Sequence, residues 1–155
     1  MTQVKFRIYV DTSVIGGCLD DEFSDESNRL LAAAKRGKIT FVVSDVVLRE
    51  LLKAPKEVRD IYESIPDESI ELLPQNLEAI KLAEAYVAAK VVTIKSQNDA
   101  VHVAYATISR VDAIVSWNFK HIVRLDRMKG YNRVNFEKGY GALEIISPKE
   151  VIVDD

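Results

Sequence analysis

Hydrophobic and polar positions alternate near the start of the chain and predict a buried strand. Within residues 6–10, Phe, Ile and Val alternate with Arg and Tyr, and the run stops at Asp11-Thr12-Ser13. Such alternation is typical of a strand with one strongly buried face. Because ligands of open α/β sheets bind at the carboxyl ends of strands, we expect Asp11 in a binding crevice. An acid in this place is also typical of a simple turn or helix cap.

Strands and helices are predicted to alternate along the rest of the chain. Short apolar runs predict further strands at 39–43, 113–117 and 143–146, and either a strand or an extended connector at 69–73. Helical spacing predicts helices at 24–37, 46–54, 58–65, 77–87, 96–110 and 119–130, whereas residues 131–141 show no clear period. This alternation predicts one α/β domain over residues 1–155, with a central, mainly parallel sheet flanked by helices.

The composition is that of a soluble globular protein, with 48% hydrophobic and 29% charged residues. No apolar run approaches the roughly 20 residues that a membrane span requires. Charges at Lys5 and Arg7 interrupt any signal-peptide core, so we expect a cytoplasmic protein without a membrane partner. The single cysteine, Cys18, excludes an internal disulfide and disfavours a structural thiolate zinc site.

The charge balance does not by itself indicate a nucleic-acid-binding protein, because the net charge is −3. One stretch differs from the rest. Between residues 118 and 139, six basic residues face only Asp126 and Glu137. The six are Lys120, Arg124, Arg127, Lys129, Arg133 and Lys138. This stretch is either a phosphate-binding patch or an ordinary solvated face.

Three further polar residues stand at strand ends or on the helices that follow them. Glu50 lies on the margin of an apolar helix face, between Val46 and Ala54. Asp99 is near the start of its helix, and Asn118 follows the strand at 113–117. Taken singly, each has an ordinary explanation: a glutamate that reaches solvent, an acid at a helix N-terminus, and a helix cap.

Together these residues predict a metal site, because a parallel sheet brings its strand ends and the following helix starts to one edge. Three carboxylates in one cleft repel one another, and a divalent cation is the simplest way to hold them ionised. Oxygen ligands favour Mg²⁺ or Mn²⁺. Such an ion can polarise a phosphodiester, so the expected chemistry is phosphodiester hydrolysis.

The same residues lie in four short motifs that resemble, in order and spacing, those of PIN domains. The motifs are Ile8–Ser13, Ser44–Leu51, Asn98–Ala106 and Ile114–Phe119. The resemblance extends to about Val151 and implies a three-layer PIN-like fold. It also implies a metal-dependent ribonuclease, most often the VapC-type toxin of a toxin–antitoxin pair.

Carried over by position, the resemblance implies that Asp11, Glu50 and Asp99 are the three family acids and the metal ligands. Ser116 resembles the hydroxyl residue before the fourth catalytic position, and Asn118 occupies that fourth position. Many members have Asp where this chain has Asn118. The missing charge leaves the first cation site intact and disfavours a second, tightly held cation.

The leading hypothesis is therefore an endoribonuclease that uses Mg²⁺ or Mn²⁺ and cuts single-stranded or loop RNA. Besides RNA, we expect an antitoxin protein and a second copy of the chain, in a homodimer, as partners. One alternative is a non-catalytic PIN-like module that binds RNA or a protein. Another is an aspartyl-phosphate enzyme using Asp11, although Ser13 stands where such phosphatases place a second acid. For His102 and His121 we expect ordinary surface or core roles rather than a metal-binding pair.

Overall fold

The computed structural model describes residues 5–153, and its core is a sheet of five parallel strands. The strands are β1 (Phe6–Val10), β2 (Ile39–Val43), β3 (Ile70–Leu72), β4 (Ala113–Val115) and β5 (Ile145–Ile146). Their order is β3-β2-β1-β4-β5, so β1 lies in the middle of the sheet. The parallel sheet expected from the sequence is confirmed.

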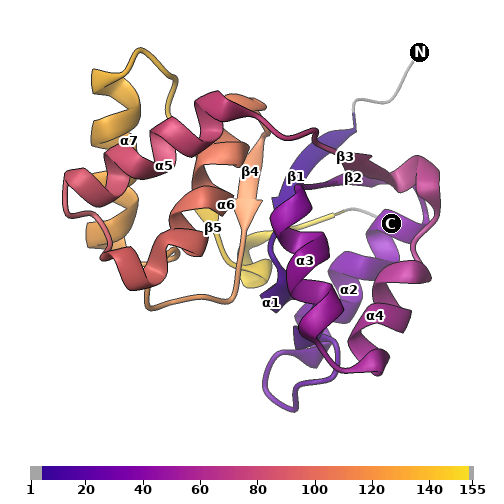
Figure 1. The fold of residues 1–155 in the computed structure, drawn as a ribbon. Helices are drawn as coiled ribbons and strands as arrows, with labels where there is room; N and C mark the ends of the chain where they lie inside the picture. Colours follow the sequence, from indigo (N-terminus) through magenta and orange to yellow (C-terminus); the bar gives the residue numbers. More distant parts are fainter. Residues whose placement is uncertain (1–4, 154–155) are drawn as a thin grey trace.

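Helices cover both faces of this sheet (Figure 1). They are α1 (Thr12–Gly17), α2 (Ser24–Lys35), α3 (Asp45–Lys53), α4 (Lys56–Glu63), α5 (Leu77–Ala88), α6 (Gln97–Ile108) and α7 (Leu125–Glu137). Short 3₁₀ turns are η1 (Asp67–Ser69), η2 (Ile94–Ser96) and η3 (Pro148–Glu150). Helices α1–α4 lie on one side and α5–α7 on the other, which confirms the three-layer α/β fold. None of the helices within residues 5–153 has the length and apolar character that a bilayer crossing requires.

The two helix layers follow from the path of the chain across the sheet. The chain moves outward from β1 through β2 to β3, and then returns past β1 to β4 and β5. Right-handed crossovers in opposite directions place their helices on opposite faces. The direction reverses between β1 and β4, and such a switch point is where open α/β sheets bind ligands.

The pairing of β1 with β4 places two polar residues side by side at this switch point. In the parallel register, Tyr9 lies opposite Ile114 and Val10 lies opposite Val115. The next residues, Asp11 and Ser116, therefore leave the sheet together. Val10 and Val115 are fully buried, so the position of both polar residues is fixed from below by tightly packed strand ends.

The region after β4 differs from the sequence prediction. Residues 119–122 form turns, and α7 begins only at Leu125 and continues through Gly130 to Glu137. The helix predicted at 119–130 is therefore correct only for residues 125–130, and the segment 131–141, which showed no clear period, is helical as far as Glu137. Gly130 does not stop the helix, because it serves close packing: a Cβ at this position would lie 2.9 Å from Cγ1 of Val91.

Gly17, at the end of α1, also allows a close approach, and it lies behind the switch point. A Cβ at Gly17 would lie 2.6 Å from Oγ of Ser27 and 2.7 Å from Nε1 of Trp117. These two side chains are joined by a hydrogen bond of 2.8 Å from the Trp117 indole to Ser27. By contrast, nothing lies within 4 Å of a Cβ at Gly16.

We predict that Gly17→Ala lowers the free energy of unfolding by about 1–3 kcal/mol, because the added methyl group forces the Ser27–Trp117 pair apart. Gly16→Ala is the matched control. It should leave the free energy of unfolding unchanged or raise it by up to about 1 kcal/mol, because alanine favours a helix more than glycine. Urea denaturation of both variants measures the difference. Equal stabilities would show that the contact at Gly17 is not tight.

Candidate active site

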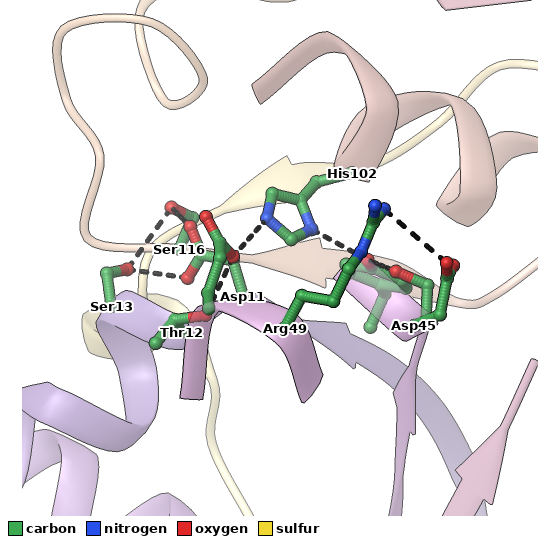
Figure 2. Close-up of polar contacts among 10 residues, drawn as sticks. Asp11, Thr12, Ser13, Asp45, Arg49, His102 and Ser116 are labelled. Atoms are coloured by element: carbon green, nitrogen blue, oxygen red, sulfur yellow. Dashed lines mark hydrogen bonds and ion pairs between the residues drawn. The ribbon is translucent and has the colours of Figure 1, made fainter. Parts of the chain in front are cut away.

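Asp11 is buried at the end of β1, with 5% of its surface exposed. It occupies the N-cap position of α1 but does not cap the helix with its side chain. Its carboxylate instead accepts hydrogen bonds from Oγ of Ser13 (2.5 Å, to Oδ1) and Oγ of Ser116 (2.6 Å, to Oδ2) (Figure 2). Burial raises the pKa of Asp11 above its usual value, although His102 and the two hydroxyl groups act in the opposite direction.

Ser116 connects this carboxylate to the backbone after β4. Its Oγ donates to Asp11 and accepts the backbone N–H of Asn118 at 2.9 Å. The Ser13 hydroxyl has a similar double role, because it accepts the backbone N–H of Trp117 at 3.0 Å. Two hydroxyl groups thus link α1, the end of β1 and the end of β4 around one buried acid.

Glu50 reaches this edge from α3, and its side chain is 34% exposed. Its Oε1 accepts two hydrogen bonds of 2.8 Å, one from Oγ1 of Thr12 and one from Nε2 of His102. Burial acts to raise the pKa of Glu50, but the hydrogen bond and charge of His102 outweigh it and bring the pKa below its usual value. Glu50 is therefore the carboxylate of this edge that stays ionised most readily.

His102, for which the sequence predicted only an ordinary role, is a direct partner of Glu50. The ring is 2% exposed, and its Nδ1 lies 2.7 Å from the hydroxyl of Tyr9. That hydroxyl lies 2.7 Å from Oγ of Ser44. Burial acts to lower the pKa of His102, but the hydrogen bond and charge of Glu50 raise it overall. Its position three residues after Asp99, on the same side of a helix, was the one available sequence signal.

Asp99, in the first turn of α6, is half-buried, and its carboxylate forms no hydrogen bond or ion pair with any residue that the structure describes. Burial raises its pKa above the usual value, and the charges of Asp11 and Glu50 add to this effect. His102 and His121 act in the opposite direction. Asp99 therefore lies in the electrostatic field of both other acids, without a hydrogen-bond donor of its own.

Asn118 has a capping role at the turn after β4. Its Oδ1 accepts the backbone N–H of Lys120 at 3.1 Å and that of His121 at 2.8 Å. The His121 carbonyl in turn accepts a hydrogen bond of 2.8 Å from the hydroxyl of Tyr131. Nδ1 of His121 is buried and has no hydrogen-bond partner in the described part of the chain.

The donor chemistry of this edge fits a hard cation, although the residues do not form a closed cage. Among residues 5–153, no three His, Cys, Asp or Glu side chains are placed closely enough to hold an ion as they stand. Asp99 nevertheless lacks any donor, and Asp11 is buried with neutral hydroxyl partners only. Mg²⁺ commonly keeps several waters and uses one or two carboxylates, which suits such an open set.

Comparisons with known proteins agree with the fold. A family model described as the PIN domain matches residues 7–120. Among solved structures, one similar chain comes from the crystal structure of VapBC2 from Rickettsia felis bound to a DNA fragment from their promoter. The TM-score is 0.56 at 17% identity, over 91% of this chain and 98% of that chain. No curated protein matches the sequence.

We predict that Asp99→Asn raises the stability of the metal-free protein at pH 7. The pKa of Asp99 is raised in the folded state, so the wild type loses stability as the pH rises through that pKa, and the amide variant does not. The stability gain of Asp99→Asn over the wild type should fade below about pH 4, where the carboxyl group is protonated even in the unfolded chain.

Urea denaturation at pH 7 and at pH 3.5 measures this effect, with Asp21→Asn as the control. Asp21 is exposed, and its substitution should change the free energy of unfolding by no more than about 0.5 kcal/mol. An Asp99→Asn variant less stable than wild type at pH 7 would contradict the prediction. Favourable interaction with the N-terminus of α6 would then outweigh burial and repulsion.

Proposed function

The chain belongs to the PIN-domain family, and from this premise we propose that it is a divalent-metal-dependent endoribonuclease that hydrolyses RNA phosphodiester bonds. The observation that carries the proposal is the Asp99 carboxylate, which lacks a donor and lies in the field of Asp11 and Glu50. Three carboxylates at one edge of the sheet, whose negative charge is little compensated by neighbouring groups, attract a cation. We propose Asp11, Glu50 and Asp99 as the ligands of Mg²⁺ or Mn²⁺.

The protein residues of this site have separate tasks. Ser13 and Ser116 orient the Asp11 carboxylate, and each takes up only one lone pair of an oxygen. Thr12 and His102 both bind Oε1 of Glu50, which leaves its Oε2 without a hydrogen bond from the described residues. A bound ion would polarise the phosphodiester and lower the pKa of a coordinated water. One of the three acids would orient the attacking water.

Ser116 and Asn118 complete the proposed catalytic set from the β4 side. Ser116 holds Asp11 and the Asn118 backbone in one arrangement. Asn118 brings a neutral amide where many family members bring a carboxylate. Because an amide adds no charge, we propose one well-held cation and a weak second one.

Single-stranded RNA is the proposed substrate, and an aromatic group beside the acids supports this choice. Phe119, directly after Asn118, is 47% exposed. Its ring lies against Trp117 at a centroid distance of 6.1 Å, and Trp117 is stacked on Phe23 at 4.1 Å. A supported, exposed ring offers a stacking face to an unpaired base, which a duplex does not present.

Basic residues after Asn118 would contact the phosphates, although the stretch from Lys120 to Lys138 is less available than its charge indicates. Arg124 pairs with Asp126 at 2.9 Å, and the Arg127 guanidinium donates to the Val91 carbonyl. Exposed ion pairs of this kind contribute little to stability and can exchange for phosphate. We therefore propose that Lys120, exposed and two residues after Asn118, is the first phosphate contact.

The proposed biological role is that of the toxin in a toxin–antitoxin pair, with an antitoxin protein as partner. The similar fold in the VapBC2 complex supports this role. We also propose a homodimer. Its support is a hollow of about 490 Å³ between α3, α5 and α6, lined mainly by apolar side chains such as Val46, Val87 and Ile94, with Arg49, Glu84, Gln97 and Asn98 also in the lining. Ile94 is 66% exposed there, and an exposed apolar surface of this kind marks a contact site.

A non-catalytic PIN-like module that binds RNA or a protein is the second candidate. The capping role of Asn118 and the open arrangement of the acids favour it. Such a module would bind RNA through Lys120 and its neighbours without cutting it. Cleavage therefore separates the two candidates.

We predict that the protein cleaves a mixed RNA pool when Mg²⁺ or Mn²⁺ is added and not in the presence of EDTA. Asp99→Asn should lower the rate by orders of magnitude, because it removes a ligand charge while the fold is retained. Asp21→Asn, an exposed acid away from the strand ends, should cut like the wild type. If the wild type leaves the pool intact with both metals, the binding module is the correct function.

We predict that Asn118→Asp tightens Mn²⁺ binding and lowers the Mn²⁺ concentration needed for cleavage. Aspartate retains an oxygen that can accept the N–H groups of Lys120 and His121, so the turn should persist. The second oxygen adds a charge to the acid cluster. Titration of Mn²⁺ against cleavage compares the two proteins. Superimposable curves would show that Asn118 only caps the turn, and its catalytic role would then be abandoned.

A further inference from the structure

A buried chain of hydrogen bonds begins behind the proposed metal ligands and ends on Glu50. It joins Oγ of Ser44 to the Tyr9 hydroxyl at 2.7 Å, and this hydroxyl to Nδ1 of His102 at 2.7 Å. Nε2 of His102 lies 2.8 Å from Oε1 of Glu50, and Figure 2 shows the His102 ring with its polar contacts as dashed lines. The four residues come from β1, the end of β2, α3 and α6, so the chain spans both helix layers.

The direction of donation along this hydrogen-bond chain is set by the Glu50 carboxylate at its end. A carboxylate only accepts, so Nε2 of His102 must carry the hydrogen. In the neutral ring Nδ1 is then an acceptor, and the Tyr9 hydroxyl donates to it. The oxygen of Tyr9 remains free to accept from Ser44. Each member therefore fixes the orientation of the next, and one tautomer of His102 is selected.

Ser44 shows that this arrangement takes precedence over local structure. It occupies the N-cap position of α3, where a serine normally stabilises the helix by about 1 kcal/mol. Its side chain makes no capping bond and is directed to Tyr9 instead. Ser44 and Tyr9 are fully buried. Replacing buried polar groups by apolar side chains of similar size is often neutral or stabilising, so stability alone does not account for these four buried or half-buried polar residues.

The contacts at Glu50 show that this hydrogen-bond chain controls the orientation of the Glu50 carboxylate. Two donors, Thr12 and His102, meet at the single atom Oε1. They hold the plane of a carboxylate that stands on the margin of α3 and would otherwise have several rotamers. Oε2 receives no hydrogen bond from the described residues, and this is the oxygen left for a cation or its water.

We propose that His102 is a positioning residue that orients Glu50 as a cation ligand, with Tyr9 and Ser44 holding its imidazole ring in place. This inference rests on the proposed function, because it assumes that Glu50 binds the metal. Partners behind metal ligands commonly change metal affinity or activity by roughly 10- to 100-fold when they are removed. Tyr9 and Ser44 should act in this way although neither touches Glu50.

Tyr9→Phe is the first test, because it removes one hydroxyl and keeps the ring. Tyr86→Phe is the matched control. Tyr86 is also fully buried, and its hydroxyl bonds to Thr107 and Asn135, away from the acids. Mn²⁺ affinity is measured by titration calorimetry on the protein alone. We expect roughly 10-fold weaker binding in Tyr9→Phe and an unchanged affinity in Tyr86→Phe, although both lose a buried hydrogen bond.

Three further variants keep the test decisive. Ser44→Ala removes the hydrogen bond farthest from Glu50 and, like Tyr9→Phe, should weaken Mn²⁺ binding. It provides the test even if Tyr9→Phe does not fold. His102→Gln retains a donor toward Glu50 and should bind Mn²⁺ more tightly than His102→Leu. In the ¹⁵N spectrum of the wild type, recorded at a pH high enough for the His102 ring to be neutral, Nε2 should carry the hydrogen and Nδ1 should not, and this difference should diminish in Tyr9→Phe.

The outcomes separate this inference from the proposed function. Mn²⁺ binding by a wild type that does not cut RNA would reject the ribonuclease and leave the positioning role supported by the affinities. Equal Mn²⁺ affinities in the wild type, Tyr9→Phe and Ser44→Ala would overturn the inference, even in an active ribonuclease. No Mn²⁺ binding by the wild type would overturn both.

Discussion

A buried carboxylate at the junction of the two central strands is the constraint on which this edge of the molecule depends. Asp11 is almost inaccessible to solvent, and leaving such a group without partners would destabilise the fold by several kcal/mol. The hydroxyl groups of Ser13 and Ser116 provide those partners. Since Ser13 lies on α1 and Ser116 follows β4, satisfying one acid also fixes how α1 leaves the sheet and where the chain continues after β4. The contacts that satisfy this buried acid therefore also set the arrangement of α1 and of the chain after β4.

The hydrogen-bond partners of Asp11 and Glu50 are hydroxyl groups and one imidazole, and the Asp99 carboxylate has none among the described residues. Within the described residues, no lysine or arginine forms a hydrogen bond or ion pair with Asp11, Glu50 or Asp99. A guanidinium group would compensate a carboxylate more strongly than a hydroxyl group does. It would also reduce the negative charge that the proposed cation site requires. Burial raises the pKa values of Asp11 and Asp99, and the neighbouring hydroxyl and imidazole groups offset this effect only in part.

The sequence predicted the features that arise from local periodicity and missed those that arise from contacts between distant segments. The alternation before Asp11 located β1 and its end, because a period of two is written in consecutive residues. The helix predicted to end at residue 130 continues through Gly130, whose close contact with Val91 arises only when α7 packs against the chain after α5. His102 was read as an ordinary residue, and it is indeed buried. Its bond to Glu50 depends on how α3 lies against α6, which no local pattern encodes.

Cap residues at this edge show where the fold gives up local stability for the site. Asn76 caps α5 with its side chain, as its sequence context predicts. Asp11 and Ser44 hold the equivalent positions after β1 and β2, yet neither caps its helix. Asp11 instead bonds to Ser13 and Ser116, and Ser44 to Tyr9, so each helix start forgoes about 1 kcal/mol of capping. Residues that break a strong local rule in a well-packed fold tend to mark functional positions. By the same criterion Asn118, which does cap its turn, is the member of the proposed catalytic set whose position is explained by local structure alone.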